Sequence, residues 1–134
     1  MASSARPLPA QGRDDMNRNN QISYVEFPAK DLEATKTFFQ TVFDWSFEDY
    51  GPEYTAFSGQ GIDGGFFHAD LASSVASGGA LVVIYSDMLE ALQEQVSQAG
   101  GLIVRPIFSF PGGRRFHFKE PSGNEMAVWS DTGG

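Results

Sequence analysis

Four side chains within the strand-like segments of this chain are the candidates for proton transfer or metal binding. They are Glu26, His68, His117 and Glu125. His117 alternates with Phe116 and Phe118, so it points away from those apolar side chains, on the face that also carries Arg115. Glu26 lies in the middle of an apolar strand, where a carboxylate needs a partner. It is either part of a structural ion pair with Arg115 or His117, or an acid or base with a shifted pKa.

The closing strand-like segment has two faces of different character. Alternation places Glu125, Ala127 and Trp129 on one face and Met126 and Val128 on the other. We expect Met126 and Val128 to pack under a helix, because they are the purely apolar pair. The other three side chains are then expected to face a cleft.

The basic residues are unevenly placed in an acidic chain. The net charge is −8, yet four of the six Lys and Arg residues beyond residue 20 lie within residues 105–119. This cluster is either a solvated hairpin or a local basic patch that attracts an anionic small molecule. The overall charge itself argues against nucleic acid and anionic membrane surfaces as partners.

The composition is that of one ordinary globular domain. The sequence has 134 residues, 41% of them hydrophobic, and contains no cysteine. Disulfides, thiolate metal sites and cysteine nucleophiles are therefore excluded, which agrees with a cytoplasmic protein. No run of about 18 apolar residues and no secretory signal is present. Residues 1–20 read as a disordered arm, with either Met1 or Met16 as the natural start.

Two helices are expected because apolar side chains recur at steps of three and four over residues 31–43 and 87–99. Asp31 is the expected N-cap of the first helix. Asp87 and Glu90 form an expected capping box for the second helix, which a Gly-Gly pair ends.

Strands are expected before, between and after these two helices. The first covers residues 22–27 and is expected to end at Pro28. The other strand-like segments lie at 45–50, 54–58, 63–69, 80–86, 101–110, 114–120 and 124–130. The order βαβββ thus occurs twice, in residues 22–69 and 80–130 of a domain spanning 21–131, with DLEA of the first copy 56 residues before DMLEA of the second.

This arrangement resembles the vicinal oxygen chelate superfamily, which includes glyoxalase I, bleomycin resistance proteins, extradiol dioxygenases and fosfomycin resistance enzymes. The resemblance covers residues 22–130 and rests on DLE at the first helix, FDW after it and FKEPSGNE before the last strand. It implies an α+β, glyoxalase-like fold in which two βαβββ repeats form curled mixed sheets around a cleft. It also implies a homodimer, whose clefts form either within or between chains.

Enzymes of this superfamily typically bind one divalent metal ion through the first and last strands of each repeat. The corresponding positions here are Tyr24, residues 65–67, Leu81 and Ala127. None of them offers a good metal ligand, so we expect a member with a degenerate metal site and no cofactor. A relocated divalent metal site would have to use Glu26, His68, His117 and Glu125, each displaced along its strand.

The resemblance and the residues together predict a metal-independent protein that binds a small, possibly anionic organic molecule. Aromatic side chains are expected to enclose this ligand: Tyr24, Phe66, Tyr85 and Trp129. Arg115, His117, Glu26 and Glu125 are expected to set the polarity of the site. The alternatives are a metal-dependent lyase, isomerase or dioxygenase with relocated ligands, and a metal-free isomerase or lyase that uses Glu26 and His117 as an acid–base pair.

Overall fold

The computed structural model describes residues 18–132 of the chain. Met1, Met16 and most of the expected arm lie outside these residues. The elements follow the predicted order of two βαβββ repeats. They are β1 (Tyr24–Ala29), α1 (Leu32–Phe43), β2 (Phe47–Asp49), β3 (Tyr54–Phe57), β4 (Asp63–His68), β5 (Val82–Tyr85), α2 (Leu89–Gln98), β6 (Leu102–Phe110), β7 (Gly113–Lys119) and β8 (Glu125–Ser130).

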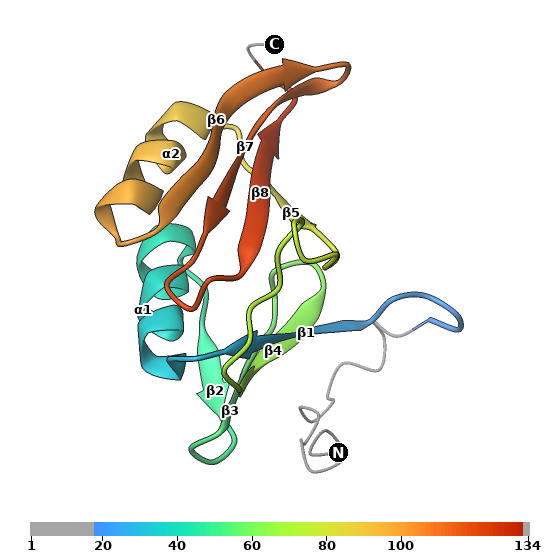
Figure 1. Cartoon of the computed structure of the whole chain (residues 1–134). Helices are drawn as coiled ribbons and strands as arrows, with labels where there is room; N and C mark the ends of the chain where they lie inside the picture. Colours follow the sequence, from blue (N-terminus) through green and yellow to red (C-terminus); the bar gives the residue numbers. More distant parts are fainter. Residues whose placement is uncertain (1–17, 133–134) are drawn as a thin grey trace.

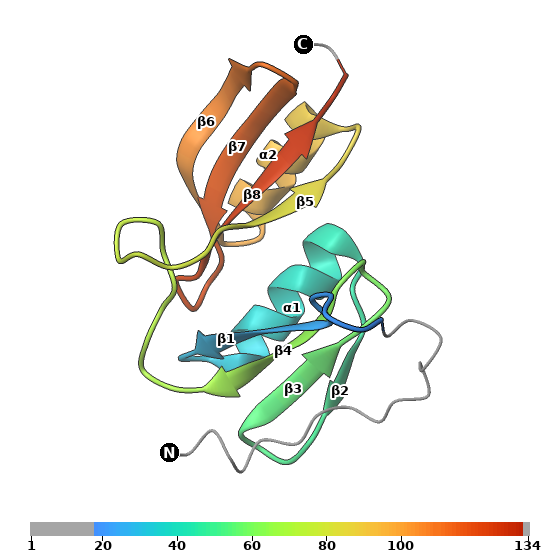
Figure 2. The same cartoon turned by 90° about the vertical axis from the view of Figure 1, so that its right-hand side faces the viewer.

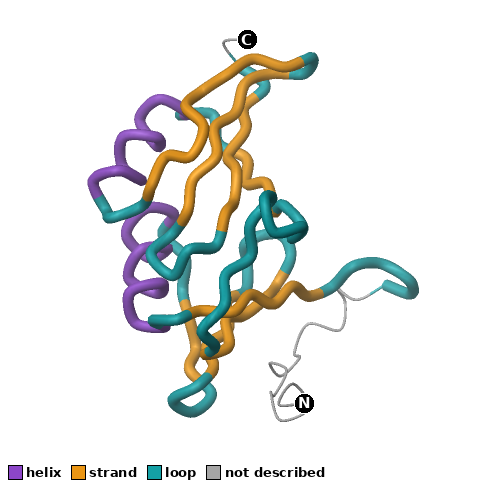
Figure 3. The backbone as a smooth tube through the Cα atoms, viewed as in Figure 1, coloured by secondary structure: helices purple, strands orange, loops and turns teal. Residues whose placement is uncertain are grey.

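Each repeat forms one mixed four-stranded sheet. The strand order is β1-β4-β3-β2 in the first sheet and β5-β8-β7-β6 in the second. The pairs β1–β4 and β5–β8 are parallel, and the other pairs are antiparallel. Figure 1 shows α2 above α1, and Figure 3 shows both helices on one side of the molecule with the strands on the other. In Figure 2 the two sheets are separate, with β5 at the edge of its sheet that lies nearest the first repeat.

The first helix begins as predicted, and the second does not. The side chain of Asp31 accepts a hydrogen bond from the backbone N–H of Ala34 at 3.0 Å, which makes it the N-cap of α1. The N-cap of α2 is Met88, without a side-chain hydrogen bond, so the predicted Asp87–Glu90 capping box is wrong. Ser86 precedes the helix instead and accepts from the Met88 N–H at 3.1 Å.

The first strand continues through Pro28, which was predicted to end it. Pro28 pairs with Phe67 in the parallel ladder between β1 and β4. The strand tolerates proline because β1 is an edge strand, where one side of the backbone needs no ladder hydrogen bond. Neither helix of the described residues is long and apolar enough to cross a membrane.

The two repeats share one hydrophobic core. Met126 and Val128 of β8 lie in this core with Leu89 and Val96 of α2, as alternation predicted. Phe118 of β7 meets the first repeat directly, with its ring centroid 5.7 Å from that of Phe38 on α1. Such burial of aromatic side chains is the largest apolar contribution to holding the repeats together.

A buried carboxylate joins the repeats at a second place. Glu120, which is 2% exposed, accepts hydrogen bonds from the Thr35 hydroxyl at 2.6 Å, the Ser122 N–H at 2.8 Å and the Asn124 amide at 2.6 Å. The same Asn124 amide donates to the Pro28 carbonyl at 2.7 Å. Burial raises the pKa of Glu120, and the three hydrogen bonds offset this only in part. We name these residues the Glu120 joint.

Candidate functional site

A cavity of about 680 Å³ opens between the edge strands β1 and β5. Side chains from both strands line it, among them Tyr24, Val25, Phe27, Val82, Ile84 and Tyr85. Phe43, Trp45, Phe57 and Met126 line it as well, so its walls come from both repeats and are almost entirely apolar. A cavity of this size and character is typical of sites for small organic molecules.

Three polar side chains form a hydrogen-bonded chain beside this cavity. Tyr54 donates to the Glu26 carboxylate at 2.9 Å, and its hydroxyl oxygen lies 2.5 Å from that of Tyr24. Because the single Tyr54 proton is used toward Glu26, Tyr24 is the donor in the second bond and presents its oxygen lone pairs outward. Burial raises the pKa of both tyrosines, which keeps both hydroxyls protonated at neutral pH.

The positions that would hold a metal ion in the superfamily do not fit one. The side chains of Leu81 and Ala127 have no atom that can coordinate a metal ion, and Ala127 is fully buried. Gly65 pairs with Glu26 in the ladder, and a Cβ atom at Gly65 would lie only 2.3 Å from the Tyr54 hydroxyl oxygen. The tyrosine therefore occupies the space into which a ligating side chain would project.

The four residues of the alternative, relocated metal site do not lie close to one another either. His68 is half-exposed at the end of β4, and its Nδ1 atom lies 3.5 Å from Oε1 of Glu53. Glu26 accepts a hydrogen bond from Tyr54 on the first sheet, whereas His117 and Glu125 form a pair on the second sheet. Among residues 18–132, no three His, Asp or Glu side chains are placed to hold a metal ion.

His117 and Glu125 form a buried pair on the second sheet. The His117 Nδ1 atom lies 3.1 Å from Oε2 of Glu125, and the two side chains are each 7% exposed. The other carboxylate oxygen of Glu125 accepts from the backbone N–H of Val75 at 3.0 Å. Burial acts to raise the pKa of Glu125, but the bonds from Val75 and His117 outweigh it and leave that pKa lowered.

Cationic and aromatic side chains surround this pair. The guanidinium carbon of Arg105 lies 3.7 Å from the ring centroid of Phe108, and that of Arg115 lies 5.5 Å from the rings of both Phe108 and Phe110. The Phe108 ring is 5.8 Å from that of His117. The ring quadrupole attracts cations that are placed over aromatic faces in this way.

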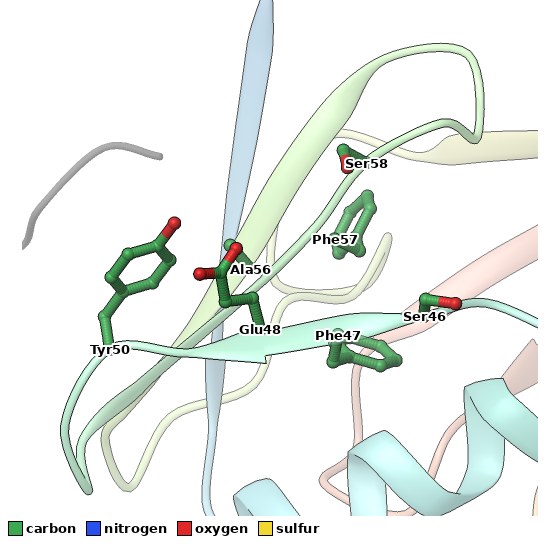
Figure 4. Close-up of a pocket in the computed structure, with 7 residues that line it drawn as sticks. All are labelled: Ser46, Phe47, Glu48, Tyr50, Ala56, Phe57 and Ser58. Carbon is green, nitrogen blue, oxygen red and sulfur yellow. The ribbon is translucent and has the colours of Figure 1, made fainter. Parts of the chain in front are cut away.

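A smaller pocket of about 250 Å³ lies on the first sheet, along β2 and β3. Figure 4 shows its lining, in which Tyr50 and Glu48 stand over the strands while Phe47 and Phe57 lie farther along. Ser46, Ala56 and Ser58 complete it. Its only acidic side chain, Glu48, is exposed on a three-residue edge strand, so the pocket offers little enclosure for a ligand.

Comparison with protein families accounts for the repeats and the cavity between them. A model of the Glyoxalase/Bleomycin resistance protein/Dioxygenase superfamily matches residues 21–128. The chain belongs to this superfamily. The resemblance read from the sequence is therefore confirmed. No curated protein sequence matches the chain significantly.

Solved structures share the fold of this superfamily member. A glyoxalase-related enzyme from Fulvimarina pelagi is 19% identical, with a TM-score of 0.70 over 83% of this chain and 88% of that one. The fosfomycin resistance protein FosX from Listeria monocytogenes is 16% identical, with a TM-score of 0.70 over 86% and 96%. A lactoylglutathione lyase from Agrobacterium tumefaciens is 17% identical, with a TM-score of 0.63 over 85% and 96%. At these identities the likeness shows the fold alone.

The structure of this superfamily member distributes the predicted ligand-binding residues over three places. Tyr24 and Tyr85 line the cavity, and Glu26 lies behind Tyr24. Arg115, His117, Glu125 and Trp129 lie on β7 and β8 and do not line the cavity, although the Trp129 ring is 5.3 Å from that of Tyr85. Phe66 is fully buried in the core and does not line the cavity, because its ring stacks on Phe27 at 5.4 Å.

Three residues of this region were not among the predicted site residues. Tyr54 follows a turn and looked like an ordinary strand residue, although the absent side chain of Gly65 leaves the space that its hydroxyl end occupies. Arg105 and Phe108 lie on β6, whose register with β7 shifts twice between Ile103 and Phe108. Such shifts change which face a side chain occupies, so simple alternation does not identify these two residues.

Proposed function

We propose that this superfamily member binds a small organic molecule in the cavity between β1 and β5 and does so without a metal ion. The observation that carries the proposal is the Tyr54 hydroxyl, which fills the space beside Gly65 and is bonded to Glu26. A side chain able to bind metal has no room there, whereas the apolar cavity next to it has the volume for a ligand.

The polar rim of the cavity indicates what such a ligand carries. Tyr24 donates its proton to Tyr54 and keeps its oxygen lone pairs for a ligand. The molecule is therefore largely apolar, flat enough to lie against Tyr85 and Trp45, and has a hydroxyl or N–H group that donates to Tyr24. The rival function is that of a metal-dependent lyase, isomerase or dioxygenase, and one experiment separates the two.

The experiment measures metal and ligand on the same protein. The chain is dialysed against nickel, zinc, manganese or ferrous iron, desalted and analysed by mass spectrometry, and then titrated with 2-naphthol by calorimetry. We expect metal far below one ion per chain and saturable binding of 2-naphthol with a negative heat-capacity change, the mark of apolar burial. One tightly held ion per chain would overturn the metal-free proposal.

Two valines make a matched pair of variants for the same titration. Val83 of β5 lines the cavity and is 42% exposed, whereas Val104 of β6 is 39% exposed and lies outside it. Val83→Phe narrows the cavity and is expected to weaken 2-naphthol binding by about tenfold, the usual scale of an overpacking cost. Val104→Phe is expected to leave it unchanged. Equal effects of the two substitutions would place the ligand elsewhere.

The proposal includes a homodimer. Large apolar side chains remain exposed on the strands of the second sheet, among them Tyr85 at 50% and Leu102 at 62%. A second copy would remove them from water, which is the usual reason for such a surface. Light scattering is expected to give twice the chain mass of 14.6 kDa, and a mass of one chain at micromolar concentration would contradict it.

A further inference from the structure

Three buried side-chain nitrogen atoms on the second sheet have no hydrogen-bond partner among the described residues, and two of them share one face of β7. These two are Nε2 of His117 and Nε of Arg115. Both side chains point to the same face of β7 because they are two residues apart, which separates their Cα atoms by about 6.5–7 Å. Nε of Arg114 shares the property, but that residue lies on the opposite face and its guanidinium pairs with Glu90. An unpaired buried polar atom is costly, so a pair of them marks a place where a ligand supplies the partners.

The direction of the His117 hydrogen bonds follows from Glu125. The Glu125 carboxylate accepts from Val75 N–H at 3.0 Å and, through its other oxygen, faces His117 Nδ1 at 3.1 Å. An ionised carboxylate only accepts, so the ring proton is on Nδ1. The lowered pKa of Glu125 agrees with its ionised form. In the neutral ring, Nε2 then offers a lone pair and needs a donor from the ligand.

Arg115 has the opposite requirement. Its guanidinium is always charged and offers donors in a planar fork that matches a carboxylate. The rings of Phe108 and Phe110, each 5.5 Å from the guanidinium carbon, stand beside it. Phe110 is also 6.3 Å from Trp129, so a wall of rings continues along the sheet. This wall would accept the flat body of a ligand whose polar end lies at Arg115 and His117.

We propose that this face binds an aromatic 2-hydroxycarboxylate. The carboxylate pairs with Arg115, the neighbouring hydroxyl donates to Nε2 of His117, and the ring lies against Phe108, Phe110 and Trp129. Arg105 is exposed and covers Phe108, so it swings off that ring as the ligand enters. The site goes beyond the proposed function, because none of these residues lines the cavity between β1 and β5.

The test uses three probes that differ by one group each: mandelate, phenylacetate, which lacks the hydroxyl, and 1-phenylethanol, which lacks the carboxylate. The chain contains two tryptophans, so Trp45→Phe leaves Trp129 as the only tryptophan reporter. We expect mandelate to change Trp129 fluorescence saturably, phenylacetate to bind about tenfold more weakly, and 1-phenylethanol weaker still. This series needs no variant of the site itself.

Variants of the protein then show which residue recognises each group of the probe. Arg115→Gln is expected to abolish the preference for the two acids over 1-phenylethanol. Arg114→Gln on the opposite face of the same strand is the control and is expected to keep it. His117→Gln is expected to reduce the preference for mandelate over phenylacetate, with circular dichroism to confirm folding.

The outcomes separate this site from the cavity. Equal binding of all three probes, no saturable binding, or mandelate binding that survives Arg115→Gln would overturn the proposal. None of these results depends on 2-naphthol, whose binding is tested by Val83→Phe. Mandelate binding that is lost in Val83→Phe and kept in Arg115→Gln would place the acid in the cavity and would also overturn the proposal.

Discussion

Glu120→Ala is expected to lower the free energy of unfolding by about 3–5 kcal/mol, because it removes the acceptor of three buried hydrogen bonds in the Glu120 joint, and a buried donor that finds no other acceptor costs about 1–3 kcal/mol. The Thr35 hydroxyl keeps one alternative acceptor, the Ser122 hydroxyl at 2.8 Å. The donors are the Thr35 hydroxyl, the Ser122 N–H and the Asn124 amide, which come from both repeats. The free energy is measured by urea unfolding followed by circular dichroism.

Glu33→Ala is the matched control for this substitution. Glu33 has an 82% exposed side chain and pairs with Lys36 on the surface of α1, so its removal is expected to have a much smaller effect. A loss in Glu120→Ala no larger than in Glu33→Ala would show that the joint contributes little to holding the repeats together. Because the repeats form the two walls of the cavity, we also expect weaker 2-naphthol binding in Glu120→Ala.

Phe66→Ala is expected to destabilise the protein by about 3–5 kcal/mol, the usual cost of removing a buried aromatic ring. Phe66 is completely buried, and its ring centroid lies 5.6 Å from that of Phe39 and 5.8 Å from that of Phe57. The surrounding rings come from α1 and β3 and cannot all move into the space left behind. The measurement is again urea unfolding.

Two further substitutions separate a core role of Phe66 from a ligand-binding role. Phe67→Ala removes the same side chain one position later, where it is only partly buried, and a smaller loss of stability is expected. Phe66→Leu keeps most of the volume, so the folded variant is expected to bind 2-naphthol as the wild type does. Loss of 2-naphthol binding in a stable Phe66→Leu variant would show that Phe66 takes part in ligand binding.

Hydrophobic alternation was sufficient to predict the faces of β7 and β8. Met126 and Val128 lie in the core and Phe116 and Phe118 with them, while His117 points the other way toward Glu125. The order of the elements and the superfamily were also readable, since each depends on local patterns and on the repeat of those patterns along the chain. The degenerate metal site was inferred from residue types alone and stays a prediction.

The tertiary structure decided where the candidate residues meet. In β4, Gly64 and Gly65 precede Phe66 and Phe67, so no side chain there indicates which phenylalanine faces the core. Pro28 stays within its strand because β1 is an edge strand, a property that only the pairing of strands defines. The donors to Glu120 include one 85 residues away along the chain, so no local pattern shows that this carboxylate is held at all.

The same reason explains why we propose two sites where the sequence suggested one. Tyr24 and Tyr85 meet across the cavity because the edges of the two sheets face each other. Arg115 and His117 lie on β7, the third strand counted from the β5 edge, and they do not line this cavity. The sequence alone determined which side chains leave the core. Packing of one repeat against the other, through contacts distant along the chain, decided which of them share a site.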